Sequence, residues 1–263
     1  MSTVTSADGT TIAYETLGSG PALILVDGAM CYRAAGPMRP LAQRLTDHFS
    51  VVAYDRRGRG ESGDTLPFAP EREVEDLAAL VDAVGGTAYG YSMSSGAGVV
   101  LAAAAAGVPF TRLLCYEPPY TSRPGDTAAK DDYTRDLAEH LAAGRRGDAV
   151  ARFMAMVGMP APAIEAMRHS PAWAALEAIA PTLAYDNAAL GDGTVPTALA
   201  ARVKVPTLVV DGGASPDFLR AAAAGLAEAL PDGSSQTLPG QTHDVDPDAL
   251  APALIAFLAA GRD

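Results

Sequence analysis

Short apolar runs alternate with amphipathic segments through the first part of the chain. Residues 22–26 form a continuous apolar run and residues 50–54 a nearly continuous one, as expected for strands buried on both faces. Residues 71–84 instead place apolar side chains at helical spacing. Further strands are predicted at residues 11–17, 87–91 and 112–116, and further helices at residues 37–45 and 96–106. The alternation predicts an α/β fold, with a mostly parallel twisted sheet and helices on both faces.

The pattern changes after residue 117. Residues 118–197 contain no convincing strand, and prolines and a glycine break them into short helical pieces. These pieces are predicted at residues 131–143, 148–157, 162–168 and 171–179. Strands return at residues 206–210 and 236–238, with helices at residues 216–230 and 247–260. We therefore expect a core of residues 1–117 and 198–263, interrupted by a helical cap of residues 118–197.

Composition and charge narrow the class of protein. The 263 residues are 49% hydrophobic, which is enough for a sizeable core. No apolar run approaches the roughly 18 residues of a membrane helix. The polar segment of residues 1–9 lacks the apolar stretch of a signal peptide, so we expect a cytoplasmic protein. The net charge of −12 repels phosphate and anionic lipid, so neither nucleic acid nor membrane is an expected partner.

Metal and redox chemistry find no support in the sequence. The two cysteines, Cys31 and Cys115, lack metal-ligand spacing, and a pair of buried free thiols is favoured over a disulfide. The four histidines are too dispersed for a local metal motif. We therefore predict no metal and no cofactor.

A candidate nucleophile lies between the predicted strand of residues 87–91 and the helix that begins at Gly96. A serine used in acyl transfer must be exposed on a sharp strand-to-helix turn, with small residues two before and two after it. Residues 90–94 place Ser92 at the centre of such a motif, and residues 92–96 place Ser94 there. We favour Ser94, because Gly96 then follows it where the helix must pack tightly on the sheet.

The candidate general base is His243. It lies after the last predicted strand and before the last helix. A base must approach the nucleophile from a separate loop, and a histidine late in the chain fits the order serine, acid, histidine.

Three motifs resemble the α/β-hydrolase superfamily. Residues 55–62, Asp-Arg-Arg-Gly-Arg-Gly-Glu-Ser, are similar to the Asp-x-Arg-Gly-x-Gly-x-Ser turn after the fourth strand of that family. Residues 26–29, Val-Asp-Gly-Ala, lie where the family has His-Gly-x, and residues 240–243 match its late Gly-x-x-His. The resemblance covers residues 10–117 and 203–262. More narrowly, residues 54–60, 72–77, 94–97 and 116–119 resemble a group of actinobacterial α/β hydrolases whose substrates are mostly unassigned.

The resemblance implies an oxyanion hole. Its donors would be the backbone N–H groups of Ala29 and of Ser95, each worth about 3 kcal/mol in the transition state. Asp27 replaces the family's usual histidine and places a carboxylate near this hole.

The acid of the triad is less clearly marked. The family's usual Gly-x-x-Asp after the seventh strand is here Gly-Gly-Ala-Ser, so Ser215 occupies the acid position. A subset of the family has its acid after the sixth strand, where this sequence has Glu117. A strand end in an open α/β sheet is where ligand sites gather. We predict Glu117 as the acid, with Asp217 and the absence of a true acid as alternatives.

The predicted substrate is a medium-sized, fairly apolar small molecule, because the cap is rich in methionine. Tyr32, Arg33, Met93 and Trp173 are candidate pocket residues. We expect hydrolysis of an ester, lactone or thioester through an acyl-enzyme. One alternative is a non-hydrolytic cyclase or lyase of natural-product biosynthesis that uses His243 as its base, and another is a non-enzymatic ligand binder. A homodimer is left open.

Overall fold

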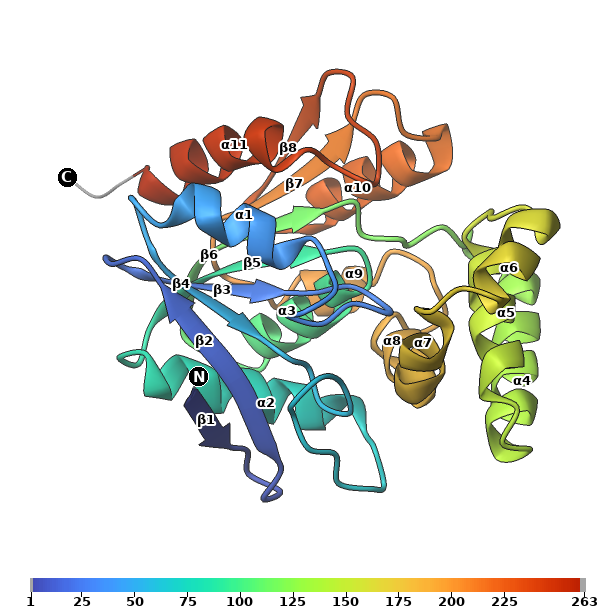
Figure 1. Cartoon of the computed structure of the whole chain (residues 1–263). Coiled ribbons are helices and arrows are strands. Elements are labelled where there is room, and N and C mark those ends of the chain that lie inside the picture. The colour runs from blue at the N-terminus through green and yellow to red at the C-terminus, as the bar shows by residue number, and fades with distance from the viewer. Residues whose placement is uncertain (1, 261–263) are drawn as a thin grey trace.

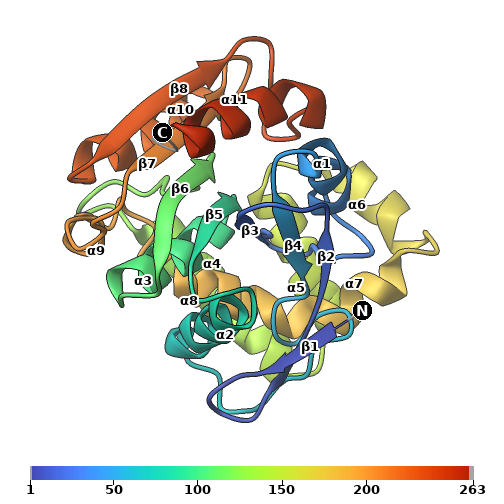
Figure 2. The same cartoon turned by 90° about the vertical axis from the view of Figure 1, so that its left-hand side faces the viewer.

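The computed structural model describes residues 2–260. Eight strands form one sheet in the order β1-β2-β4-β3-β5-β6-β7-β8, with β1 at one edge and β8 at the other (Figure 2). Strand β2 is antiparallel to both of its neighbours, β1 and β4. All strand pairs from β4 to β8 are parallel. The strands are β1 Ser2–Thr5, β2 Thr11–Leu17, β3 Ala22–Val26, β4 Ser50–Tyr54, β5 Ala88–Met93, β6 Phe110–Tyr116, β7 Thr207–Gly212 and β8 Gly233–Leu238.

Helices cover both faces of this sheet, as the alternation of apolar runs predicts. Figure 1 shows α1 and α11 above the sheet and α2 and α3 below it. Leucines of α1 and α11 share one apolar cluster with β3 and β6, whereas α2, α3 and α10 contribute to the cluster on the other face. These helices are α1 Met38–Leu45, α2 Pro70–Ala83, α3 Gly96–Ala105, α10 Asp217–Ala229 and α11 Pro247–Ala259.

The strand order changes direction between β3 and β5. The chain passes from β3 outward to β4 and then returns to place β5 on the other side of β3. The connections that leave the carboxyl ends of β3 and β5 therefore diverge, and ligands of open α/β sheets bind in the crevice at such a point. Residues 27–30 and Ser94 lie there.

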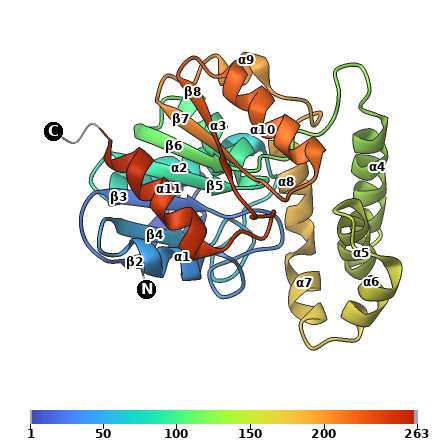
Figure 3. The same ribbon diagram turned by 90° about the horizontal axis from the view of Figure 1, so that it is seen from above.

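Residues 117–206, all of which the structure describes, contain no strand. Their helices are α4 Ala128–Ala142, α5 Arg146–Met156, α6 Ala161–Arg168, α7 Trp173–Ile179, the 3₁₀ turn η1 Ala180–Thr182, α8 Leu183–Ala189 and α9 Thr197–Ala200. Helices α7 and α8 follow one another beside the core, and α4, α5 and α6 lie beyond them (Figure 3). We refer to α4–α8 as the helical region.

The differences from the predicted elements lie at the edges of the sheet. The four-residue β1 is missing from the predicted strands, and the predicted segment covers only half of β8. Five of the six residues of β8 are exposed, so the strand shows no apolar pattern. Helices α8 and α9 also lacked a prediction. Among residues 2–260, no helix is long and apolar enough to cross a membrane.

Candidate active site

Backbone strain is concentrated at one edge of the sheet. Among residues 2–260, the non-glycine residues with positive φ are Met30 (61°), Ser94 (54°) and Glu117 (44°). They follow β3, β5 and β6, which are neighbours in the sheet. Left-handed backbone costs on the order of 1–3 kcal/mol at such residues, and strained residues of this kind cluster at functional sites. The clustering therefore marks this edge as the candidate active site.

Ser94 occupies the sharp turn between β5 and α3. Its backbone N–H donates to the Tyr116 carbonyl oxygen at 2.9 Å, and its side chain is half-buried. The turn requires small neighbours. A Cβ atom on Gly28 would lie 3.0 Å from the Ser94 Cβ, and a Cβ atom on Gly96 would lie 2.6 Å from the Val26 carbonyl oxygen. The predicted need for small residues around this serine thus has a direct steric cause.

The competing candidate, Ser92, lies inside β5. Its backbone pairs with Val26 on one side and Cys115 on the other, and its side chain has no exposed surface. A nucleophile must be accessible to a substrate carbonyl. The geometry therefore favours the register centred on Ser94.

Glu117 and His243 are joined by a short hydrogen bond. The His243 Nδ1 and the Glu117 Oε2 are 2.7 Å apart, and Glu117 Oε1 accepts the Gly212 N–H at 2.8 Å. Burial disfavours the ionised form of Glu117, whose side chain is fully enclosed, but these hydrogen bonds outweigh that effect and hold its pKa below the usual value. An ionised carboxylate at Nδ1 leaves the other ring nitrogen, Nε2, free to accept a proton.

The loop that carries His243 is fixed to the sheet on one side. The Tyr116 hydroxyl donates to the carbonyl oxygen of Thr242 at 2.6 Å, while the His243 side chain remains 42% exposed. In the described part of the chain, no hydrogen bond joins Ser94 to His243. Such bonds are often long in a free enzyme and tighten when substrate binds.

The structure does not bring the alternative acid, Asp217, to His243. Its side chain is fully exposed at the start of α10, where its closest ionic partner is Arg220 at 3.9 Å. Ser215, at the family's usual acid position, is buried, and no hydrogen bond joins its hydroxyl to another described residue. Within residues 2–260, Glu117 is the carboxylate bonded to His243.

The loop after β3 carries the predicted oxyanion donor Ala29. Arg59 holds this loop by donating to the carbonyl oxygens of Gly28 at 2.5 Å and Cys31 at 3.2 Å. Asp27 is only 2% exposed, and burial raises its pKa to about 7 against the attraction of nearby arginines. A carboxyl with this pKa is largely neutral below pH 7, so it repels an oxyanion less than the sequence suggested.

Two buried arginines connect the core to the helical region. Arg56 donates to both oxygens of Glu73 at 2.6 and 2.8 Å and to Asp186 at 2.6 Å, and Arg59 donates to the other oxygen of Asp186 at 2.6 Å. Asp186 belongs to α8. Burial disfavours its charge, but the two arginines outweigh burial and lower its pKa.

Sequence reasoning did not single out Asp186. Its partners lie in the motif of residues 55–62, but they are 127 and 130 positions away, and no spacing pattern links them. The one available signal was indirect. Three arginines follow directly after a buried strand, and each arginine that is itself buried needs an acidic partner.

The four predicted pocket residues do not gather into one pocket. Tyr32 is half-buried in the loop after β3, and Arg33 is held by an ion pair with Asp55 at 3.0 Å. Met93 packs in the core cluster beneath α1 and α11, and Trp173 packs inside the helical region; each is 8% exposed. The apolar character of Met93 and Trp173 therefore serves packing.

A different apolar surface faces the oxyanion loop. Ala29 and Met30 pack against one cluster of the helical region, which consists of Tyr133, Leu137, Ala149 and Leu183 with Leu141, Phe153 and Ala184 at its margin. Met30 also contacts the cluster around Trp173. The side chains above the candidate oxyanion hole are thus mainly hydrocarbon and aromatic.

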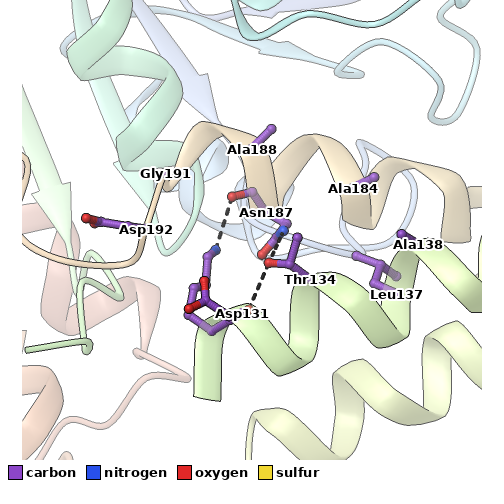
Figure 4. Close-up of a pocket in the computed structure, with 10 residues that line it drawn as sticks. Asp131, Thr134, Leu137, Ala138, Ala184, Asn187, Ala188, Gly191 and Asp192 are labelled. Atoms are coloured by element: carbon purple, nitrogen blue, oxygen red, sulfur yellow. Dashed lines mark hydrogen bonds between the residues drawn. The ribbon is translucent and has the colours of Figure 1, made fainter. Parts of the chain in front are cut away.

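A separate cavity of about 430 Å³ lies between α4 and α8 (Figure 4). Lys130 donates to the Asn187 carbonyl oxygen at 3.1 Å at this cavity, and burial lowers the pKa of Lys130 to about 8. The residues that line the cavity do not include Ser94, Glu117 or His243. Over residues 2–260, no three acidic, histidine or cysteine side chains are placed to hold a metal ion.

Comparisons with known proteins agree with this fold. A sequence model of the alpha/beta hydrolase family matches residues 19–253. An alpha/beta hydrolase from Sphaerobacter thermophilus is 51% identical, with a TM-score of 0.86 over 98% of this chain and 100% of that one. A thermophilic esterase from Thermogutta terrifontis is 23% identical, with a TM-score of 0.70 over 98% and 97% of the two chains. An enol-lactonase from Burkholderia xenovorans is 21% identical, with a TM-score of 0.66 over 97% and 99%.

Proposed function

Because the chain belongs to the alpha/beta hydrolase family, we propose that it is a serine hydrolase with Ser94 as nucleophile, His243 as general base and Glu117 as the supporting acid. The observation that carries the proposal is the 2.7 Å bond between Glu117 and His243 at the sheet edge where Ser94 adopts its strained turn. A serine, a histidine and a carboxylate with these roles are the three groups that acyl transfer of this kind requires.

The first half of the reaction forms an acyl-enzyme. The Ser94 Oγ attacks the carbonyl carbon of the substrate while its proton passes to the Nε2 of His243. Glu117 accepts the Nδ1 proton in a hydrogen bond and stabilises the imidazolium that results. The N–H groups of Ala29 and Ser95 bind the oxygen that becomes negative. His243 then gives its proton to the leaving group, and the C–O or C–S bond to that group breaks.

The second half releases the acid. A water molecule attacks the acyl carbon, His243 takes its proton, and the same N–H groups bind the second oxyanion. The bond to the Ser94 oxygen breaks as His243 returns the proton to it. The enzyme is regenerated without a cofactor.

The proposed substrate is an ester, lactone or thioester with a medium-sized, fairly apolar acyl group. The apolar cluster around Tyr133 and Leu137 supports this proposal, because its contacts with Ala29 and Met30 place hydrocarbon beside the proposed oxyanion hole. The known esterase and enol-lactonase of similar fold are consistent with this class of bond. The helical region then acts as the cap over the site.

A fluorophosphonate probe tests the nucleophile. The probe should label the wild-type protein, and peptide mapping should place the label on Ser94. Ser94→Ala should abolish labelling. Ser92→Ala is the matched control, because that hydroxyl is fully buried two residues away, and it should label at the wild-type rate. A label on Ser92 would disprove the register, and an unlabelled protein that also leaves 4-nitrophenyl esters intact would favour non-hydrolytic chemistry.

Glu117→Gln tests the acid. The Gln oxygen would still accept the Gly212 N–H, so its NH₂ group would face Nδ1 of His243. Nδ1 would then be an acceptor and Nε2 would carry the proton, which is the wrong tautomer for a base. We expect kcat to fall by about three to four orders of magnitude with the protein still folded. The exposed Asp217 provides a control, since Asp217→Asn should leave kcat unchanged. If kcat fell in Asp217→Asn and not in Glu117→Gln, Asp217 would be the acid and Glu117 would not.

A further inference from the structure

Asp186 reaches the candidate active site from outside the core. It lies on α8, yet its side chain is only 6% exposed and all hydrogen bonds of that side chain go to the core. They come from the guanidinium groups of Arg56 and Arg59 at 2.6 Å each and from the Ser95 hydroxyl at 2.8 Å. One carboxylate therefore contacts two motifs of the site at once.

The Ser95 hydroxyl does not cap the helix that it precedes. Ser95 is the N-cap of α3, where a serine side chain usually accepts a hydrogen bond from an N–H of the first helical turn. Here the side chain makes no such bond and donates to Asp186 instead. Ser95 follows the nucleophile, and its N–H is a proposed oxyanion donor. The bond to Asp186 therefore fixes the residue whose backbone must point at the oxyanion.

Arg59 connects Asp186 to the other side of the proposed oxyanion hole. One end of its guanidinium bonds Asp186, and the other donates to the carbonyl oxygens of Gly28 and Cys31. These residues flank Ala29, the second proposed donor. Asp186 is thus connected to Ser95 by one hydrogen bond and to the loop of Ala29 by two successive ones, through Arg59.

The charges around Asp186 suit a site that must bind an anion. Asp186 forms ion pairs with two buried guanidinium groups, those of Arg56 and Arg59, so its negative charge lies beside two positive ones. A lone carboxylate beside an oxyanion would oppose catalysis, but this one is compensated. A buried ion pair alone is weak evidence for added stability, so a positioning role has to be argued from what the pair holds.

Helix α8 docks firmly enough to act as a fixed support. It packs against α3 at Gly98, where a side chain would collide with the backbone of Ala189. Thr182, just before α8, accepts a further hydrogen bond from Arg59 at 3.1 Å. The position of Asp186 is therefore set by backbone packing.

We propose that Asp186 is a positioning residue, which holds the oxyanion hole from the helical region through Ser95 on one side and Arg59 on the other. The inference rests on the proposed function, because it assigns no role to Asp186 unless Ser95 and Ala29 bind an oxyanion. The hole is then complete only while α8 is docked on the core.

Two variants test this role. Ser95→Ala removes one hydroxyl and leaves the backbone N–H and the ion pairs of Asp186 in place, so the protein should fold with its thermal midpoint within about 3 °C of wild type. Asp186→Asn keeps the shape of the side chain and removes its charge. The matched control is Asp76→Asn, because Asp76 is also buried and bonds a buried arginine, Arg57, at 2.7 and 2.8 Å.

The measurements are the rate of fluorophosphonate labelling at Ser94 and the kcat and KM for 4-nitrophenyl butyrate, taken where circular dichroism shows each variant to be folded. We expect Ser95→Ala to lower kcat and the labelling rate about tenfold, and Asp186→Asn about a hundredfold, with KM within about threefold of wild type. Asp76→Asn should lose thermal stability and keep its kcat within about twofold.

The outcomes separate the two proposals. A wild-type protein that is labelled at Ser94, together with a folded Ser95→Ala variant of wild-type kcat, would overturn the role of Asp186 and leave the serine mechanism intact. A kcat loss in Asp76→Asn as large as that in Asp186→Asn would also overturn it, because stability would then explain both. If Asp186→Asn does not fold, Ser95→Ala decides alone. If the wild type itself is not labelled, the proposed function fails first.

Discussion

Replacing Asp27 by asparagine should make the protein more stable as the pH rises, relative to wild type. Asp27 is 2% exposed and its Oδ1 accepts the Gly28 N–H at 3.2 Å. Asparagine has the same shape and can accept the same hydrogen bond through its own oxygen. The substitution therefore removes one titrating group and leaves the packing of the loop in place.

The size of the effect follows from the pKa. Burial raises the pKa of Asp27 to about 7, whereas an aspartate in an unfolded chain titrates near 3.9. Between these values the folded state keeps a proton that the unfolded state has lost, so the free energy of unfolding falls by about 1.4 kcal/mol per pH unit. The loss is complete above pH 7. The Asp27→Asn variant has no such titration. Its free energy of unfolding, relative to that of wild type, should therefore rise by roughly 3 kcal/mol between pH 5 and pH 8.

Urea unfolding of both proteins at pH 5, 6, 7 and 8 measures this difference. Other groups titrate in the same range, but they are common to both proteins and cancel when the two free energies are subtracted at each pH. A difference that stays constant from pH 5 to pH 8 would refute the reasoning. It would mean that Asp27 is already ionised at pH 5, held in that form by Arg56 and Arg59.

Two further predictions concern the glycines that permit the turn at Ser94. Gly28→Ala should lower kcat about tenfold while the protein still folds. The new Cβ atom would lie 3.0 Å from the Cβ atom of Ser94 and displace the nucleophile. An unchanged kcat for 4-nitrophenyl butyrate would contradict this expectation. Gly96→Ala should lower the free energy of unfolding in urea by about 1–3 kcal/mol, because its Cβ would lie 2.6 Å from the Val26 carbonyl oxygen. Gly63→Ala is the control, since its Cβ would meet nothing closer than 3.5 Å, and equal losses in the two variants would contradict the steric argument.

The sequence predicts the central part of the fold well and its edges poorly. The strands β3, β4 and β6 are buried on both faces, so apolar runs reveal them directly. The edge strands β1 and β8 are held by backbone hydrogen bonds, and their mainly exposed side chains need no apolar pattern. Helices α8 and α9 are short, with seven and four residues, which is close to the shortest length that periodicity can detect.

The same contrast applies to the candidate site. Ser94 could be proposed because a tight strand-to-helix turn imposes small residues nearby, and those residues are visible in the sequence. Glu117 could be proposed because it ends a strand in the parallel part of the sheet, and the structure brings it within 2.7 Å of His243. Tyr32, Arg33, Met93 and Trp173 were proposed from residue type and position along the chain. Residue type cannot tell an apolar side chain that packs a core from one that lines a pocket.

Asp186 shows why the remaining part of such a site escapes prediction. A residue that touches substrate lies where the topology of the sheet requires it, so its position along the chain is informative. A residue that supports the site from an inserted helical region is placed only by the way that region docks. Docking here depends on a glycine at position 98 and on charge pairs between residues more than 120 positions apart. In the sequence these arginines and this aspartate look like any others. What distinguishes them is that they are buried together, which only the structure shows. Support from the helical region also couples the shape of that region to the oxyanion hole, so a change in α8 that alters the substrate pocket should alter kcat as well as KM.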